Sequence, residues 1–506
     1  MNINQDPMTL DPRQGYDLVS SSIHFLLFEG LMRKTGSGEL VPGQAESVEI
    51  SEDGLTYVFH LRECYWSNGQ RVRAQDFEKS WKKILSPHFV APNAPLFYLI
   101  KNAEKAKKGE VKEEEIGISC LDENRFKVEL DYPAPYFLNL TSFCVFFPVN
   151  ADGDEKKPDW WKSEVKEGFI CNGPFTLAEW KHGDKIVVDR NPRYWDSSRI
   201  SLEHIHVSMI ADSNTALKMF ENGQLDMLGF GISPIPYEAL PYLKTANNLK
   251  TLDSTGSTFI TFNVDKPPFN SLSIRKAFAL ALNRQEIVSS ITQMGEKVAS
   301  CMVPPPLKEG KEDSLLQDNQ PERAKQLLQK GLEELGIEKS SFPKIVYTYA
   351  AGDVTRKLAQ IVQRQIKDVL DIDIVIEHCD YKTLLSRLGQ RQYHMASAIW
   401  VAQFDDIASI LGRFSLKQNA KNYPGWESSR FVQLLNASNQ EQDSQKRRKL
   451  LDEAETIFAE ELPLIPIFHW RDGFMVQPYV IYPPIAPGGF FDYASIRLKN
   501  SESKKS

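Results

Sequence analysis

The residues that are able to do chemistry form none of the common catalytic constellations. The chain has no HExxH or GxSxG motif, and Gly310-Lys311 lacks the upstream glycine of a phosphate-binding loop because Pro305 stands there. Gly229-Phe230-Gly231 lacks the third glycine of a dinucleotide fingerprint and is followed by Pro234 and Pro236. We therefore expect a protein that is not an enzyme, with no catalytic residue and no cofactor.

Two pairs of neighbouring polar residues need separate interpretation. His204-Ile205-His206 would place both rings on one face of a strand, as a metal site requires, but no nearby residue completes the ligand set. We expect a surface strand there and no metal. Asp405-Asp406 resembles a pair of catalytic carboxylates, yet adjacent side chains point apart on strands and on helices. A helix cap or a ligand contact is the expectation.

The composition is that of a soluble globular protein. The 506 residues allow two to four folding units, and 42% hydrophobic with 25% charged residues excludes a disordered or membrane chain. The formal net charge is -7, with basic residues scattered among acidic ones, which excludes nucleic acid as a partner. The six cysteines have no metal-ligand spacing, so we expect buried thiols, with one disulfide as the alternative.

Two segments bear on export and on membrane insertion. The N-terminus lacks the basic and apolar regions of an export signal, so we expect that such a signal was removed or never present. The apolar stretch from Phe137 to Val149 contains polar residues and is shorter than the ~20 residues that cross a bilayer. We predict that it is core.

The elements of the first half follow from periodicity and turn signals. Alternating residues between Ala45 and Phe59, around the turn Ser51-Glu52-Asp53-Gly54, predict a β-hairpin, and a strand pair is expected at 116–118 and 126–130. A helix should begin near Ala74. The serines 20–22 are expected to cap a helix at 23–27.

The second half alternates strands and helices. A strand at 202–210, a helix capped by Asp212 and a strand at 225–228 predict a βαβ unit. Pro267-Pro268 should mark a linker or lobe edge before a helix at 274–291. The helices at 322–335 and 355–369, with strands at 344–349 and 372–376, predict an α/β lobe with a mostly parallel sheet.

Short blocks along nearly the whole chain resemble the family 5 extracellular solute-binding proteins, the oligopeptide- and dipeptide-binding proteins of ABC transporters. Each block is weak alone, and the order and spacing together make the signal. The blocks are Leu10-Asp11-Pro12, Phe28-Glu29-Gly30-Leu31, Pro42 to Ser47, Phe59-His60-Leu61-Arg62, Trp66-Ser67-Asn68-Gly69, Ala74-Gln75-Asp76-Phe77, Asn172-Gly173-Pro174-Phe175, Asn191 to Trp195, Phe262-Asn263, Lys266 to Phe269, and Leu462 to Pro466.

The resemblance implies an α/β protein with an α+β insert, in the two-lobed periplasmic-binding-protein-like fold of the large three-domain type. Domain I would comprise 1–40, 168–265 and 480–506, domain II 41–167, and domain III 266–479. The ligand would lie between lobes that close by hinge motion.

The resemblance also implies the substrate-binding component of an ABC peptide importer, which captures short peptides and delivers them to the membrane permease. A monomer in the periplasm or on the outer face of the cytoplasmic membrane is expected, with a lipid anchor in the native precursor. Two alternatives remain open: another solute on the same scaffold, such as a cell-wall peptide, a metal complex or a sugar, or a peptidase or chaperone.

By analogy with the family, twelve residues are expected to face the ligand. They are Tyr16, Asp17, Leu18, Phe262, Asn263, Tyr381, Trp400, Val401, Ala402, Gln403, Asp405 and Arg413. For Tyr381 and Trp400 the alternative is a core aromatic, and for Asn263 it is a turn or ladder role.

Two departures from the family pattern affect the ligand's charged ends. Well-known members have an aspartate three residues after the tryptophan, which pairs with the ligand's α-amino group, whereas this chain has Gln403. A neutral amide accepts a hydrogen bond without neutralising an ammonium. Ser397 also replaces a basic residue of some members. Either Asp405, Asp17 and Arg413 or Arg356 take over the charge pairing, or the ligand has different ends.

Overall fold

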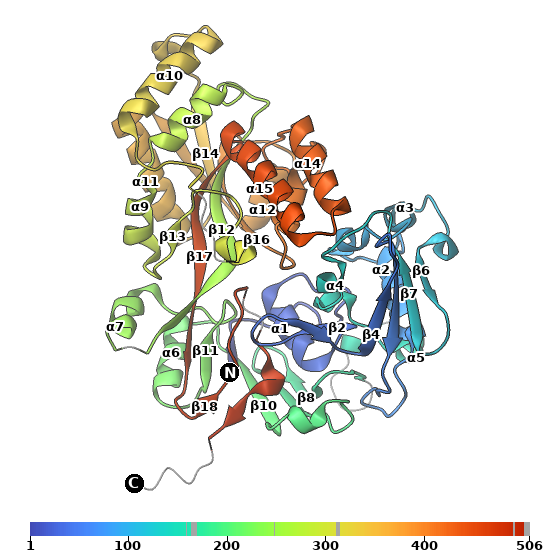
Figure 1. Cartoon of the computed structure of the whole chain (residues 1–506). Coiled ribbons are helices and arrows are strands. Elements are labelled where there is room, and N and C mark those ends of the chain that lie inside the picture. Colours follow the sequence, from blue (N-terminus) through green and yellow to red (C-terminus); the bar gives the residue numbers. More distant parts are fainter. Residues whose placement is uncertain (158, 163–168, 247, 310–313, 489–490, 500–506) are drawn as a thin grey trace. The chain divides into compact units, whose positions relative to one another are not determined.

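The computed structural model describes residues 1–157, 159–162, 169–246, 248–309, 314–488 and 491–499 (Figure 1). The chain forms two compact units, which we call unit 1 (Met1–Lys250 and Gly473–Ser506) and unit 2 (Thr251–Asp472). Among the described residues, no helix combines the length and apolarity needed to cross a membrane. The division of unit 1 into domains I and II stays a prediction, and its boundary at 167/168 lies outside the described residues.

Unit 1 contains two four-stranded sheets, with strand orders β1-β10-β9-β8 and β4-β5-β7-β6, two strand pairs, β2-β3 and β18-β19, and a short strand, β11. Its strands are β1 (Asn2–Ile3), β2 (Met32–Lys34), β3 (Leu40–Pro42), β4 (Ala45–Ile50), β5 (Thr56–Leu61), β6 (Ile118–Cys120), β7 (Arg125–Glu129), β8 (Phe175–Lys181), β9 (Lys185–Arg190), β10 (His204–Met209), β11 (Met227–Gly229), β18 (Val480–Ile481) and β19 (Arg497–Leu498). Its helices are α1 (Leu18–Leu27), α2 (Ala74–Leu85), α3 (Ala103–Lys108), α4 (Phe137–Leu140), α5 (Ala151–Lys156), α6 (Ser213–Glu221) and α7 (Leu240–Thr245).

The predicted β-hairpin is confirmed, since β4 and β5 pair antiparallel with Val48 opposite Phe59. The strand pair β6-β7 and the start of α2 at Ala74 are confirmed as well. Aromatic packing joins these elements: the Trp81 ring of α2 stands edge-on to Phe126 of β7, with centroids 5.0 Å apart. The apolar stretch from Phe137 to Val149 is largely buried, as predicted.

The predicted helix cap at serines 20–22 is wrong. Helix α1 begins at Leu18, and its N-cap is Asp17, whose Oδ1 accepts a hydrogen bond from the Ser20 backbone N–H at 2.8 Å. A carboxylate satisfies this exposed N–H and also favours the positive end of the helix dipole, so the helix extends N-terminal to the apolar run. The serines lie inside the helix.

The predicted βαβ unit is also wrong, although its elements exist. Asp212 caps α6 as expected, accepting from the Thr215 N–H at 2.7 Å. Strand β10 pairs with β1 and β9, whereas β11 pairs antiparallel with residues 474–476, from the far end of the chain. A strand of three residues is too short for its alternation of apolar and polar residues to predict which distant strand it pairs with.

A buried ion network lies in unit 1 around Arg13, whose side chain is 1% exposed. The guanidinium donates to both carboxylate oxygens of Asp154, at 2.8 and 2.9 Å, and to Asp11 at 2.7 Å. Lys83 adds a second cation on Asp154 at 2.6 Å. Although burial opposes the charged form of Asp154, hydrogen bonds from Arg13 and Lys83 and their charges lower its pKa.

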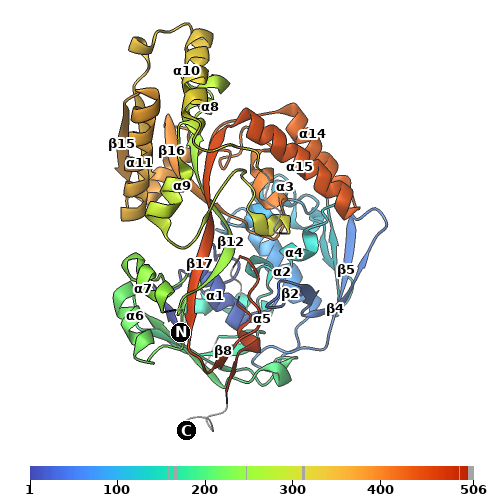
Figure 2. The ribbon, with the colours of Figure 1, turned by 60° about the vertical axis from the view of Figure 1, so that its left-hand side comes forward.

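Unit 2 is built on a sheet whose strands follow the order β17-β12-β16-β14-β15, with β13 on the outer side of β17. Figures 1 and 2 show β12 and β17 as long neighbouring strands, and they show α14 beside α15. The strands are β12 (Lys250–Phe262), β13 (Lys297–Val298), β14 (Ile345–Ala350), β15 (Ile374–Cys379), β16 (Met395–Val401) and β17 (Leu464–Val476). The helices are α8 (Leu272–Leu280), α9 (Arg284–Ile287), α10 (Pro321–Leu335), α11 (Asp353–Leu370), α12 (Tyr381–Gly389), α13 (Ala408–Leu411), α14 (Ser429–Gln440) and α15 (Ser444–Glu461).

Each face of this sheet has its own hydrophobic core. Successive residues of β16 alternate: Met395 belongs to the core with α8, α10 and α11, whereas Ala396, Ala398 and Trp400 belong to the core with α12, α14 and α15. The period of two residues in a strand explains this division. Unit 2 is therefore an α/β sandwich with helices on both faces, and the strand period places Trp400 on the α14–α15 side.

Three expectations for unit 2 need correction or limitation. The sheet is mixed, because β14 is parallel to β15 and β16 while β12 is antiparallel to β16. The predicted helix at 274–291 is interrupted: α8 ends at Leu280, and Asn283 caps α9 by accepting from the Glu286 N–H at 2.9 Å. Pro267-Pro268 lies inside unit 2. The strand and helix predictions at 322–376 are confirmed within a few residues.

Unit 2 also holds a buried ion pair, between Lys308 and Glu455, whose side chains are 0% and 2% exposed. Glu455 accepts a further hydrogen bond from the Val303 backbone N–H at 2.8 Å. The Lys308 ammonium lies 3.6 Å from the Cys301 sulfur. Lys308 therefore compensates a carboxylate that is removed from water.

All six cysteines are free thiols, and the expectation that they are buried holds for four of them, whereas Cys120 and Cys379 are partly exposed. Cys64, Cys144, Cys171 and Cys301 are buried. Burial raises the pKa of Cys64, Cys144 and Cys171 to about 12, which keeps these side chains as protonated, unreactive thiols.

Candidate functional site

In unit 1, the structure places Tyr16, Asp17 and Leu18 together at the start of α1. Tyr16 and Leu18 are exposed, although both are large and apolar. Asp17 uses Oδ1 as the helix cap, while its Oδ2 is buried and accepts from no donor among the described residues. A carboxylate oxygen between two exposed apolar side chains is an acceptor available to a cationic group. We therefore keep these three residues as one part of the candidate site.

In unit 2, Phe262 and Asn263 have structural roles. Phe262 is fully buried and stacks on Phe269, with ring centroids 4.5 Å apart. The Asn263 amide donates to the carbonyl oxygens of Arg391 and Tyr393 at 2.8 and 3.3 Å, and its Oδ1 accepts from the Asp265 N–H. The turn role that the sequence left open for Asn263 therefore exists. Ligand contact by these two residues stays a prediction without support from their packing.

Trp400 lies at the centre of an aromatic cluster. The ring is 4% exposed and packs on Phe259, Phe414 and Tyr423, with centroids 5.0 to 5.6 Å away. Its buried indole Nε1 has no acceptor in ideal hydrogen-bond geometry among the described residues, and it faces the Tyr423 hydroxyl, whose pKa is raised by burial and lowered by this interaction. Trp400 is therefore a core aromatic by packing.

Arg413 covers the other side of this cluster, with its guanidinium carbon 4.6 Å from the Trp400 ring centroid. The guanidinium donates to the carbonyl oxygens of Ser409 and Val401, both at 3.1 Å. Burial lowers the pKa of Arg413 to about 10, with the Tyr423 hydroxyl opposing the shift. Two carbonyl groups thus hold the cation in place without neutralising it.

The segment after Trp400 is held mainly through its backbone. The Ala402 N–H donates to the Thr255 carbonyl oxygen at 3.1 Å, and the Gln403 N–H donates to the Ser409 hydroxyl at 2.8 Å. Both side chains are partly exposed, as is Val401. Of these three residues, Val401 contacts Arg413 through its carbonyl oxygen, and ligand contact by Val401, Ala402 and Gln403 stays a prediction.

The two adjacent carboxylates diverge, as expected. Asp405 is exposed, whereas Asp406 forms a two-pronged ion pair with Arg447 at 2.7 and 2.8 Å. Asp406 also accepts from the Ala408 N–H at 2.8 Å, which fixes the turn before α13. Ligand contact by Asp405 stays a prediction.

Three further residues are linked to this cluster: Tyr423 contacts Trp400, Tyr381 lies near Tyr423, and Lys421 lies near Arg413. Tyr381, the first residue of α12, is half exposed, and Tyr423 is buried. Burial raises the pKa of both hydroxyls, so both remain protonated hydrogen-bond donors at neutral pH. The Lys421 side chain is exposed, and partial desolvation of its ammonium and, second, the Arg413 charge lower its pKa. Sequence reasoning missed Lys421 and Tyr423, which lie in a turn without regular periodicity.

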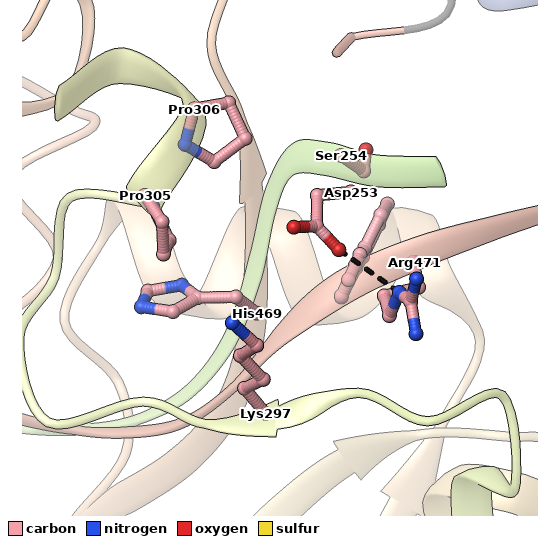
Figure 3. Close-up of a pocket in the computed structure, with 8 residues that line it drawn as sticks. Asp253, Ser254, Lys297, Pro305, Pro306, His469 and Arg471 are labelled. Carbon is pink, nitrogen blue, oxygen red and sulfur yellow. Dashed lines mark ion pairs between the residues drawn. The ribbon is translucent and has the colours of Figure 1, made fainter. Parts of the chain in front are cut away.

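Figure 3 shows a small pocket of unit 2, about 10 Å³, lined by Asp253, Ser254, Lys297, Pro305, Pro306, His469, Trp470 and Arg471. An ion pair of 2.9 Å joins Asp253 of β12 to Arg471 of β17. The volume suits about one water molecule and no peptide. The pocket therefore belongs to the structure of the β12–β17 strand pair.

His469, on the wall of this pocket, is a buried neutral histidine. Its Nδ1 lies 2.7 Å from the Ser257 hydroxyl. Burial and, second, the charge of Lys308 lower the pKa of His469 to about 3. The folded chain therefore keeps this ring unprotonated at pH values where an unfolded histidine, with a pKa of about 6.5, binds a proton.

Between pH 7 and pH 4.5 we expect His469 to reduce the free energy of unfolding by about 2–3 kcal/mol, because only the unfolded state gains the proton as the pH falls. His469→Asn should remove this component, and His378→Asn, at an exposed position of unit 2, should leave it. Urea unfolding of the three proteins at pH 7, 6, 5 and 4.5 measures the slopes. Equal slopes for His469→Asn and the parent would contradict the assignment.

The histidine pair of β10 lies on the surface, as predicted. His204 and His206 are both exposed, and His204 Nδ1 lies 2.7 Å from Asp189. Within the described residues, no group of three or more His, Cys, Asp or Glu side chains is arranged to hold a metal ion. His204 therefore makes a surface contact with Asp189.

The chain is similar to solute-binding proteins over almost its entire length. Residues 39–422 match the family model described as bacterial extracellular solute-binding proteins, family 5. The oligopeptide-binding protein OppA of Bacillus subtilis is 36% identical over 96% of this chain and 90% of its own length. The dipeptide-binding protein DppE of the same organism is 32% identical, over 97% and 90%. The solved structure of Haemophilus influenzae OppA in complex with the peptide RPPGFSPFR matches at 26% identity and a TM-score of 0.80, over 98% of both chains.

Proposed function

The chain belongs to the bacterial extracellular solute-binding proteins of family 5 and has their two-lobed fold, and from this premise we propose that it captures oligopeptides for an ABC importer. The names of its two Bacillus relatives support a peptide ligand. The protein would deliver the peptide to the membrane permease and perform no chemistry on it. It would act as a monomer on the outer side of the cytoplasmic membrane, with a lipid anchor in the native precursor.

The observation that best supports a peptide ligand is the state of Asp17. A peptide brings an ammonium group that must be paired when water is expelled, since an unpaired buried charge costs several kcal/mol. Asp17 Oδ2 is a buried acceptor without a donor among the described residues, and Tyr16 and Leu18 on either side are exposed. We propose that Asp17 takes over the ammonium pairing that Gln403 cannot perform, with Asp405 as the alternative partner.

Mass spectrometry of the material released by denaturing the purified protein tests the proposed function. A mixture of short peptides is the expected result. Release of a single sugar, a metal complex or a defined cell-wall fragment would replace the oligopeptide ligand by another solute on the same scaffold. Turnover of a peptide that persists through rigorous purification would reject the role as a binding protein without chemistry.

Asp17→Asn is expected to weaken binding of a tetra-alanine peptide at least about tenfold, because it removes the charge that pairs with the ammonium. Asparagine caps helices as well as aspartate does, so α1 should remain intact. Asp212→Asn is the matched control, since Asp212 caps α6 in the same way. Calorimetric titration measures both. An effect at Asp405→Asn alone would move the assignment to Asp405, and no effect at either position would reject it.

A further inference from the structure

The segment that leads to Asp17 rests on a buried histidine. His24 lies on α1, is 0% exposed, and places its Nε2 3.0 Å from the Thr9 carbonyl oxygen. Because a carbonyl group only accepts, Nε2 carries the proton and donates. Burial lowers the pKa of His24 to about 4, so the ring is neutral at neutral pH and Nδ1 carries no proton. His24 therefore fixes the start of the segment 9–15 through one hydrogen bond.

The end of this segment, Gly15, is buried against the same ring. A Cβ on Gly15 would lie 2.5 Å from Cε1 of His24 and 3.1 Å from its Nδ1. A methyl group at such distances has to displace either the ring or the backbone. Glycine avoids this conflict, because it has no side chain and lets the backbone approach closely. The imidazole of His24 therefore contacts both ends of the segment.

A second side chain reaches Gly15 from a distant part of unit 1. The Asn93 amide donates to the Gly15 carbonyl oxygen at 2.9 Å, and Asn93 is 6% exposed. Asn93 directly precedes a short 3₁₀ helix, Ala94–Phe97, which fixes its backbone. Gly15 thus contacts an imidazole through its α-carbon and an amide through its carbonyl oxygen. Two buried side chains of different segments restrict the position of this one residue.

The position of Gly15 matters because the next three residues are the unit 1 part of the candidate site. Tyr16 and Leu18 are exposed, and the buried Oδ2 of Asp17 has no donor among the described residues. The charge of Asp17 opposes the effect of burial on the pKa of His24, so the carboxylate and the ring are neighbours. A group that contacts a ligand needs supporting residues that fix its place. A shift of Gly15 would move Asp17.

We infer that His24 and Asn93 are positioning residues of the ligand site, which hold Gly15 so that Asp17 meets the ammonium group of the bound peptide. This inference rests on the proposed function and extends it to side chains that do not touch the ligand. Asp17 supplies the charge, and His24 and Asn93 supply its position. The two residues therefore control the preference for a free α-amino group and leave the other ligand contacts unchanged.

The test is calorimetric titration of the full chain with tetra-alanine and with N-acetyl tetra-alanine, which lacks the ammonium group. We expect the parent protein to bind the free amine about tenfold or more tightly, as for a desolvated charge pair. His24→Leu and Asn93→Leu remove the two donors and should reduce this preference to about threefold or less. His24→Gln should keep most of the preference, because the glutamine amide is able to donate to the Thr9 carbonyl oxygen.

A substitution at Gly15 tests the steric contact. Gly15→Ala should reduce the preference for the free amine as His24→Leu does. Gly15→Ala combined with His24→Ala should lose less than the two single variants together, because the ring that the methyl group meets is gone. His469→Leu is the matched control and should keep the full preference, since His469 is a buried neutral histidine of unit 2 that contacts Ser257. Binding of the acetylated peptide at the parent's affinity shows that the fold and the rest of the site are intact.

The possible failures are distinguishable. If neither peptide binds the parent protein, the proposed function fails and the positioning role fails with it. If both peptides bind the parent with equal affinity, peptide capture stands, and the pairing by Asp17 and the positioning role are rejected. If the parent prefers the free amine while His24→Leu and Gly15→Ala keep that preference, only the positioning role is rejected.

A purely structural role of His24 gives a different result. Equal loss of both peptides in every His24 variant, His24→Gln included, would reject the positioning role, because it assigns the ring to the packing of α1. If His24→Leu does not fold, Gly15→Ala and Asn93→Leu decide by the same ratio of the two affinities. A full preference for the free amine in both of these variants would then overturn the inference.

Discussion

Replacing Arg13 by methionine is expected to lower the free energy of unfolding of unit 1 by about 3–5 kcal/mol, the loss that follows when one partner of a buried ion pair is removed. The variant leaves Asp11 without its cation in a buried position, and Asp154 retains only Lys83. The folded state must then keep a carboxylate charged without a partner or protonate it.

Urea unfolding at pH 7, with hydrogen exchange to assign the change to unit 1, measures the effect of Arg13→Met. Arg125→Met is the matched control, because Arg125 pairs with Asp122 at an exposed position, where ion pairs contribute less than about 1 kcal/mol. Adding Asp11→Asn to Arg13→Met should recover part of the loss. A loss below about 1 kcal/mol for Arg13→Met would show that the network is dispensable.

Replacing Lys308 by methionine should cost unit 2 a similar amount, about 3–5 kcal/mol, because Glu455 would remain buried without the cation that compensates its charge. The pKa of His469 should also rise, since the Lys308 charge is one of the two causes that lower it. Proton NMR of the His469 ring follows this second change independently of stability.

The control for Lys308→Met is Lys325→Met, which breaks an exposed ion pair with Glu322 in the same unit. The double variant with Glu455→Gln should regain part of the lost stability, because it removes the stranded charge while keeping the acceptor for the Val303 N–H. Equal stability of Lys308→Met and Lys325→Met would reject the role of the buried pair.

Elements with a strong local pattern were predictable from sequence. The β4–β5 hairpin follows from alternation around an Asp-Gly turn, and α10 and α11 follow from apolar residues at helical spacing. Pairings between distant segments were not predictable. Strand β11 finds its partner at residues 474–476, and the start of α1 depends on one carboxylate oxygen of Asp17.

The candidate site was predictable where it depends on sequence position and not where it depends on side-chain direction. The resemblance to the family pointed to Trp400 and its neighbours, whose role in binding stays a prediction, and the structure packs Arg413 and Tyr423 on the Trp400 ring. Phe262 belongs to the same family-like block as Asn263, but its side chain lies in a hydrophobic core. Helices cover both faces of this sheet, so side chains on both faces are apolar. The sequence pattern therefore does not reveal on which face a given side chain lies.

The pairing of β11 with the last three residues of β17 also affects the order in which the two units can fold during biosynthesis. Residues 251–472 form a continuous stretch that can fold as soon as the ribosome has released it. Residues 227–229, made earlier, must wait for 474–476 before their backbone groups are paired. A nascent chain that stops just after Asp472 would therefore hold a complete unit 2 attached to an incomplete unit 1.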